Sequence, residues 1–293
     1  MRIQYELARA LYKNGSYAEC LALSQRAADA GYVAAQFDVG VYYYNGQDYA
    51  QAMAWFMKAA DQGNSLAQDA IGALYNEGYG VKQDYSQAMA WYKKAADQGN
   101  ADAQYNLGVS YERGEGVKQD YAQAMAWYKK AADQGNADAQ YNVGVFYNNG
   151  YGVMQDYAQA VAWYRKAADQ GNAGAQYNIG VAYDRGEGVK RDYAQALVWY
   201  RKAADQGNAD AQYNIGVLYN NGYGVKQDYA QAMAWYMKAA DQGDADAQYN
   251  LGVSYERGEG VKQDRAQARA WYQKAADHGG KDAIAALKRL PAN

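Results

Sequence analysis

The chain repeats one pattern of apolar and polar positions every 36 residues. The tryptophans show the period most simply, because each stands 36 residues from the next: Trp55, Trp91, Trp127, Trp163, Trp199, Trp235 and Trp271. A fixed period of 20 to 50 residues is typical of stacked repeat arrays, whose units contact only their neighbours. The sequence therefore predicts a single repeat solenoid over 1–293, not two globular domains.

The first half of a unit predicts a helix from Asn100 to the loop at 113–116. Asn100 can cap it, and Ala103, Leu107 and Tyr111 share one face. Gly108 beside that face costs about 1 kcal/mol relative to alanine, so its recurrence indicates a close approach of the partner helix. The loop glycines can take positive φ and end the helix.

The second half of a unit predicts a helix that opens at Asp120, which forms a D-x-x-Q capping box with Gln123. Gly135 ends this helix. Its predicted buried face has Trp127 at its flank and consists of Tyr121, Ala124, Met125, Tyr128, Ala131 and Ala132. A helix pair of this kind buries little alone and much when stacked. The fold class is therefore all-α.

The array has irregular ends. Residues 1–64 predict two short pairs, with helices over about 2–13, 17–29, 33–45 and 49–61; residues 65–280 form six 36-residue units; a closing helix over 281–289 precedes a tail to residue 293. This makes eight pairs plus one helix. In the last pair Arg265 and Arg269 replace Tyr and Met, which favours structural capping over a site.

A second period of 72 residues lies on the first, because the loops alternate between a tyrosine form at Tyr79, Tyr151 and Tyr223 and a charged form at Glu115, Glu187 and Glu259. Duplication of a two-unit block is the simpler interpretation. The other is that aromatic and charged loops alternate along one edge of the array because this edge is functional. One position of the unit varies most inside the array, where successive units have Ser110, Phe146, Ala182, Leu218 and Ser254. It predicts a flank or seam between units, where variation reflects either tuned specificity or drift.

Composition narrows the function classes. The formal charge of −3, without a basic stripe, argues against nucleic acid. No apolar run approaches the ~20 residues of a membrane span, and one cysteine, Cys20, excludes an internal disulfide or a zinc cluster. We expect no cofactor and no metal, and we favour a monomer. The N-terminus does not resemble a signal peptide; a cytoplasmic location is favoured, and a periplasmic or secreted one stays open if a leader was removed.

The unit resembles the Sel-one-like repeat family, a branch of the tetratricopeptide-like solenoids. The pattern A-x-A-Q-x-x-L-G-x-x-Y-x-x-G-x-G-V begins at Ala101, and D-Y-x-x-A-x-x-W-Y-x-K-A-A-x-x-G begins at Asp120. The resemblance covers 65–280 and implies a right-handed superhelix whose first helices line a concave groove. Many relatives are bacterial, and most are adaptors or scaffolds for protein complexes.

The predicted partner-binding residues lie opposite the Leu107 face, where Tyr105, Val109 and Glu112 should point into the groove with Asn106 on its shoulder. The tyrosine and asparagine recur as Tyr141 and Asn142, Tyr177 and Asn178, Tyr213 and Asn214, and Tyr249 and Asn250. An amide both donates and accepts, so these rows can bind an extended peptide or protein edge. The alternative is that they only link successive helices. Asp69 and Ala70 occupy these places one unit earlier, so the rows start after them.

Catalysis is not expected, because a residue present in every unit cannot single out one active site. His278 is the only histidine and should be an exposed helix-end residue, and Cys20 should be a buried thiol. No serine has the lysine three residues on that S-x-x-K chemistry needs. The predicted function is a non-catalytic scaffold. A dedicated inhibitor or immunity-type protein that sequesters one enzyme, and a purely structural or consensus-like array, are the alternatives.

Overall fold

The computed structural model describes residues 17–290, with side chains from residue 21 onward, and every regular element in that range is an α-helix. The predicted helix over 2–13 and the side chain of Cys20 lie outside the described residues. The helices are α2 (Tyr17–Asp29), α3 (Val33–Asn45), α4 (Tyr49–Asp61), α5 (Ser65–Glu77), α6 (Tyr85–Asp97), α7 (Ala101–Arg113), α8 (Tyr121–Asp133), α9 (Ala137–Asn149), α10 (Tyr157–Asp169), α11 (Ala173–Arg185), α12 (Tyr193–Asp205), α13 (Ala209–Asn221), α14 (Tyr229–Asp241), α15 (Ala245–Arg257), α16 (Arg265–Asp277) and α17 (Lys281–Arg289).

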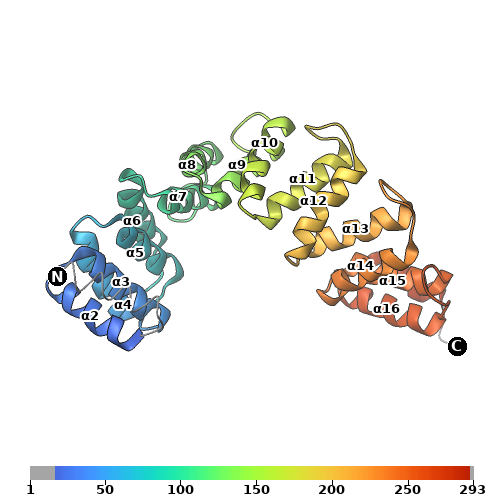
Figure 1. Ribbon diagram of the computed structural model, residues 1–293, viewed down its shortest axis with the longest axis horizontal. Helices are drawn as coiled ribbons and strands as arrows, with labels where there is room; N and C mark the ends of the chain where they lie inside the picture. Colours follow the sequence, from blue (N-terminus) through green and yellow to red (C-terminus); the bar gives the residue numbers. More distant parts are fainter. Residues whose placement is uncertain (1–16, 291–293) are drawn as a thin grey trace. The chain divides into compact units, whose positions relative to one another are not determined.

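The helices form stacked pairs, in agreement with the predicted solenoid (Figure 1). From α3 to α16 each odd-numbered helix is the first of a pair; within the compact units first helices pack on second ones, as α7 does on α8 and α13 on α14, and second helices pack on the next first helix, as α6 does on α7. The chain divides into two compact units. The first comprises the chain to Phe146 with Gly150–Met154, and the second comprises Tyr147–Asn149 with the chain from Gln155.

The helix ends follow the predicted caps. The Asn100 side chain accepts a hydrogen bond from the backbone N–H of Ala103 at 2.8 Å, and Asp120 accepts one from Gln123 at 3.0 Å. Gly114 follows α7 in the left-handed conformation, with φ of 74°. The predicted helices over 17–29, 33–45, 49–61 and 281–289 have the observed bounds, and among them α4 begins with the same kind of cap, in which the Asp48 side chain accepts from the Gln51 N–H.

The glycine inside the first helices α3, α5, α7, α11, α13 and α15 faces an aromatic ring. A Cβ added to Gly108 would lie 2.5 Å from the Tyr128 ring, and the equivalent glycine of α11, Gly180, has the same relation to Tyr200. The predicted close approach of the partner helix is therefore confirmed. The prediction for Tyr121 was wrong: it is exposed rather than part of the buried face, because it is the first residue of α8 and its ring, 5.0 Å from that of Tyr151, packs on a loop residue that is itself exposed.

A buried glutamine joins each pair to the preceding one, and we call this arrangement the glutamine relay. Gln104 of α7 donates through Nε2 to the carbonyl of Ala96 at the end of α6, at 3.3 Å, and accepts through Oε1 from Gln134 after α8, at 2.8 Å. The Ala96 carbonyl also accepts from the backbone N–H of Gly99 at 2.9 Å, so the relay adds a second hydrogen bond to this carbonyl inside the stack. The buried member recurs as Gln36, Gln68, Gln140, Gln176, Gln212 and Gln248.

The tryptophans lie beside this core. Trp127 is buried, and the Lys130 ammonium lies 3.8 Å from the centroid of its ring. On the second helix of every pair from α4 to α16, the lysine three residues after the tryptophan makes the same contact. A cation over an indole face is attractive, and the lysine stem covers the ring from water.

Of the two arginines in the final pair, Arg269 has a structural role. Arg269 donates to the carbonyl of Leu290, beyond the end of α17, at 2.5 Å, and Arg289 of α17 pairs with Glu256 at 2.7 Å. The arginine that replaces an apolar residue therefore satisfies backbone carbonyls of the closing helix. This contact supports the capping interpretation over a binding site.

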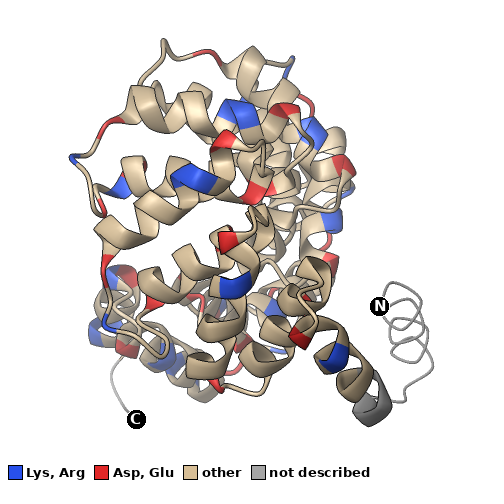
Figure 2. Ribbon diagram, turned by 90° about the vertical axis from the view of Figure 1, so that its left-hand side faces the viewer, with Lys and Arg blue, Asp and Glu red and all other residues tan. Residues whose placement is uncertain are grey.

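Charged residues of both signs are spread along the helices (Figure 2). No helix in the described range is long and apolar enough to cross a membrane. Within residues 17–290 no group of three acidic, histidine or cysteine side chains is placed to hold a metal ion.

Truncation of a tryptophan tests the packing. Trp163 on α10 is 7% exposed, so Trp163→Ala should lower the free energy of unfolding by about 3–5 kcal/mol. Met154→Ala is the control, because Met154 is 87% exposed and its loss should change little. Thermal melting of both variants measures the difference, and an unchanged curve for Trp163→Ala would contradict its burial.

Removal of a relay member tests the link between pairs. Gln212→Ala leaves the Ala204 carbonyl without the amide donor and should cost about 1–3 kcal/mol in denaturant unfolding. Gln242→Ala removes only the exposed partner of Gln212, so we expect a loss below about 1 kcal/mol. Equal losses for the two variants would show that the buried bond to the carbonyl contributes nothing.

Candidate functional site

The predicted binding residues occupy the fifth and sixth positions of successive first helices. Both rows are half-buried in every unit from α7 to α15, so they are neither sealed in the core nor fully exposed. We call this surface the first-helix face, and it is made by Tyr105, Asn106, Tyr141, Asn142, Tyr177, Asn178, Tyr213, Asn214, Tyr249 and Asn250.

Within each compact unit, the tyrosine of one first helix bonds to the asparagine of the next. Tyr105 is hydrogen-bonded to Asn142, Tyr177 to Asn214, and the Asn250 amide donates to the Tyr213 hydroxyl at 3.5 Å. The two rows are thus joined across the seam between neighbouring pairs. Linking successive first helices is therefore one role of these residues.

Four tyrosines of the row, those of α7, α11, α13 and α15, also pack against a second-helix tyrosine of their own pair. The ring centroids of Tyr105 and Tyr128 are 5.6 Å apart, and those of Tyr177 and Tyr200 are 5.8 Å apart. Burial first, and the Asp138 carboxylate second, raise the pKa of Tyr105. The hydroxyl therefore keeps its proton at neutral pH and remains available as both donor and acceptor.

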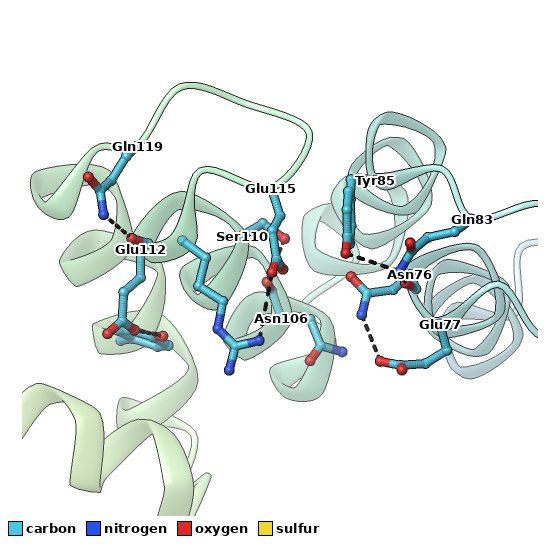
Figure 3. A network of polar contacts seen from close by, with 11 residues as sticks. Asn76, Glu77, Gln83, Tyr85, Asn106, Ser110, Glu112, Glu115 and Gln119 are labelled. Carbon is cyan, nitrogen blue, oxygen red and sulfur yellow. Dashed lines mark hydrogen bonds and ion pairs between the residues drawn. The ribbon is translucent and has the colours of Figure 1, made fainter.

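The carboxylate at the end of each charged-loop helix lies differently from the prediction. Glu112, expected to point into the groove, accepts a hydrogen bond from the Tyr128 hydroxyl of its own pair (Figure 3). Asp184 does the same with Tyr200 at 3.2 Å, and Glu256 with Tyr272 at 2.6 Å. These carboxylates act inside a pair, because the otherwise buried tyrosine needs an acceptor for its hydroxyl.

The row begins at Asp69 of α5, which takes the place of the tyrosine. Its carboxylate accepts a hydrogen bond from the Asn106 amide at 3.0 Å. Burial raises the pKa of Asp69 to about 6; the Asn106 bond opposes the rise, and Asp102 adds to it. The rows therefore start with an acid held by the first asparagine.

A hollow opens beside the row on α11. It holds about 220 Å³ of solvent space and is lined by Asn148, Tyr177, Asn178, Val181, Ala182, Arg185 and Glu187. Three of these positions, Tyr177, Asn178 and Val181, correspond to the predicted groove residues. Sequence reasoning missed the others, although the alternation of the loops was a signal that could have identified Arg185 and Glu187.

The loop alternation has a packing cause. Each loop turns back on the first helix, because Tyr79 and Glu115 both donate their backbone N–H to the tenth residue of the helix, Leu74 or Ser110, at 3.0 Å. This cap favours an apolar contact between the two side chains. Tyrosine loops accordingly accompany Leu74, Phe146 and Leu218, and charged loops accompany Ser110, Ala182 and Ser254, all of them buried.

The tyrosine of the loop also reaches back to the preceding pair. Tyr79 stacks on Tyr49 at 4.7 Å and Tyr223 on Tyr193 at 4.9 Å. The variable position was expected at a flank or seam between units, and its burial together with its match to the loop type identifies it as part of the loop packing. Neither free drift nor direct contact with a partner is needed to explain its variation.

His278, which was considered for catalysis because it does not recur in every unit, has a structural role. His278 is exposed, as predicted, and its Nδ1 lies 2.9 Å from the Gln248 Oε1. The Gln248 amide nitrogen donates to Ala240, so the oxygen faces the ring and Nδ1 carries the hydrogen. His278 thus replaces the exposed glutamine of the relay.

The family is decided by the repeats themselves. A family model described as Sel1 repeat matches residues 33–64, 65–100, 101–136, 137–172, 173–208, 209–244 and 245–280. The chain belongs to the Sel1 repeat family. The resemblance stated from the motifs is confirmed, and the short pair α3–α4 is an additional Sel1 repeat before the six long ones.

Two solved structures of Sel1 repeat proteins resemble the chain closely. One is c5321, titled a protective antigen present in uropathogenic Escherichia coli strains and displaying an SLR fold, with 38% identity and a TM-score of 0.90 over 99% of the present chain. The chain spans 64% of the length of that protein. The other, a Sel1 repeat protein from Oxalobacter formigenes, has 36% identity and a TM-score of 0.74, covering 82% of this chain and 96% of its own. Comparison with curated proteins gave no match.

Membership in the Sel1 repeat family indicates the broad class of function. Sel1 repeat proteins generally mediate protein–protein interactions, and their fold is generally a non-catalytic scaffold. The coarse prediction from the sequence, a protein-binding repeat array, agrees with this.

The acid at the start of the row predicts a pH dependence. An Asp pKa near 6 in the folded chain, against 3.8 as the ordinary value, means that the folded state keeps a proton that the unfolded state releases between these pH values. The free energy of unfolding should therefore fall as pH rises from about 4 to about 6. Asp69→Asn should remove this fall and stabilise the chain at pH 7 by about 1–3 kcal/mol.

Denaturant unfolding at pH 4, 5, 6 and 7 measures the effect. Asp133→Asn is the control, because Asp133 is exposed at the end of α8 and should leave the profile unchanged. The same pH dependence in the parent and in Asp69→Asn would show that Asp69 titrates as an ordinary carboxyl, because all other carboxyls contribute equally to both profiles.

Proposed function

We propose that the chain is a non-catalytic scaffold that binds an extended peptide or protein edge along the first-helix face. The observation that supports this most directly is that the tyrosine and asparagine rows are half-buried in every unit, beside an open hollow on α11. An ordered polar surface of this kind binds at low cost, because its side chains are already held in place.

The link between Tyr and Asn leaves capacity for a partner. An asparagine side chain offers two N–H donors and an oxygen with two lone pairs. The bond between Asn250 and Tyr213 uses one donor, and the remaining groups can pair with the backbone of an extended segment. A single asparagine can thus both join two helices and contact a ligand.

The tyrosines contribute contact area. Tyr177 is held by the Asn214 bond and by the Tyr200 ring, so little side-chain entropy is lost when it is covered. Repetition multiplies the effect, because an extended partner would meet the same two residue types at each step. The partner is expected to be a protein or peptide rather than nucleic acid, since the formal net charge of the chain is −3.

Changing Asn142, Asn178 and Asn214 together to Ala tests the proposal. Pull-down with the whole chain and mass spectrometry first identifies a partner, and the affinity of that partner is then measured for parent and variant. We expect at least a tenfold loss, since each backbone bond to an amide contributes about 0.5–1.5 kcal/mol.

The matched control removes the other end of two of these links. Tyr105→Phe and Tyr177→Phe delete the hydroxyls that bond to Asn142 and Asn214 and keep the rings. If the asparagines only join helices, the asparagine and tyrosine variants should weaken binding and stability alike. Undiminished binding by the asparagine variant would reject the proposal.

A further inference from the structure

The polar residues that line the hollow on α11 recur in the sequence every second unit. They are Asn148 at the end of the preceding first helix, Asn178 and Arg185 on α11, and Glu187 in the loop. The same residue types return 72 positions later as Asn220, Asn250, Arg257 and Glu259, and 72 positions earlier as Asn76, Asn106, Arg113 and Glu115. Figure 3 shows Asn76, Asn106 and Glu115 of the earlier set around Ser110.

The intervening unit has no equivalent set. On α13, Leu218 stands where α11 has Ala182, and Asn221 and Tyr223 stand where α11 has Arg185 and Glu187. Leu218 is buried at 2% exposure and Tyr223 stacks on Tyr193, so larger side chains fill this region and both charges are absent. We call the polar set of α11 and of α15 the recess.

The recess carries one positive and one negative charge. In the sets of α7 and α15 the guanidinium and the carboxylate are 3.8 Å and 3.7 Å apart, which is a loose ion pair with capacity for further hydrogen bonds. A carboxylate ligand would gain from the arginine and be repelled by the glutamate, and a cationic ligand would meet the reverse. A neutral amide donates to the glutamate and accepts from the arginine at the same time.

We infer that the first-helix face binds its partner in a two-unit register, with an uncharged Gln or Asn side chain in each recess. The inference rests on the proposed function and adds the chemistry of the partner. α11 and α15 lie in one compact unit with α13 between them. At about 8–10 Å per helix, the recesses are about 16–20 Å apart, which an extended chain spans in about five or six residues.

Selection from a random dodecapeptide phage library against the whole purified chain tests this register. We expect enriched peptides to carry Gln or Asn at two positions five or six residues apart. Peptides that bind the parent but lose binding to the Asn178→Ala, Asn214→Ala variant are those that use the first-helix face. Enrichment of such peptides without paired amides would overturn the register while leaving the proposed function intact. Failure to enrich any peptide that depends on these asparagines would count against the proposed function, and the register with it.

Charge variants of one recess provide the second arm, with a selected peptide and its Glu and Lys analogues as probes. Glu187→Gln should change the preference at that peptide position from Gln to Glu by about tenfold, and Arg185→Gln should change it from Gln to Lys by about the same factor. Lys190→Gln, an exposed change of charge outside the recess, is the control. If both recess variants keep the preference for Gln at that peptide position, the two charges do not select the partner side chain.

Discussion

The stack depends on burying the end of one second helix under the next first helix with every polar group there hydrogen-bonded, because an unpaired one would cost more than a hydrogen bond contributes. The Ala96 carbonyl accepts from the backbone N–H of Gly99 at 2.9 Å and from the Gln104 amide at 3.3 Å. Gln104 is itself buried, and its side-chain oxygen accepts from Gln134. Because the two glutamines come from both helices of a pair, the same contact fixes the pair internally and against its predecessor.

The second constraint is distance within a pair. Gly108 admits the Tyr128 ring to a place that any Cβ would occupy, and the hydroxyl of that ring then needs a partner near the end of the first helix. Charged-loop pairs supply a carboxylate, such as Glu256 for Tyr272. The 72-residue period is thus visible in the core, in the loop and in the buried tenth position of the helix at once, which indicates that the two-unit block packs as a matched set.

Much of this fold could be predicted from the sequence because its determinants are local. Caps such as Asn100 and stops such as Gly114 act within four residues of themselves, so helix bounds follow from spacing alone. The direction of side chains that lie between repeats could not be predicted in the same way. Tyr121 turns outward because a loop from the next unit supplies a stacking partner, and Glu112 turns inward because a tyrosine of its own pair needs an acceptor.

The same distinction explains what was found and missed on the first-helix face. Its rows were predicted, since Tyr105 and Asn106 recur at fixed positions, but the cross-link between rows depends on how neighbouring pairs are offset. The recess was missed because Asn148, at the end of the preceding first helix, meets Ala182, Arg185 and Glu187 of the next unit. Repeat arrays place such features together only after stacking. Chemical difference along an otherwise uniform surface therefore comes from the loops and the buried tenth position, while the repeated asparagines supply the common part of the contact.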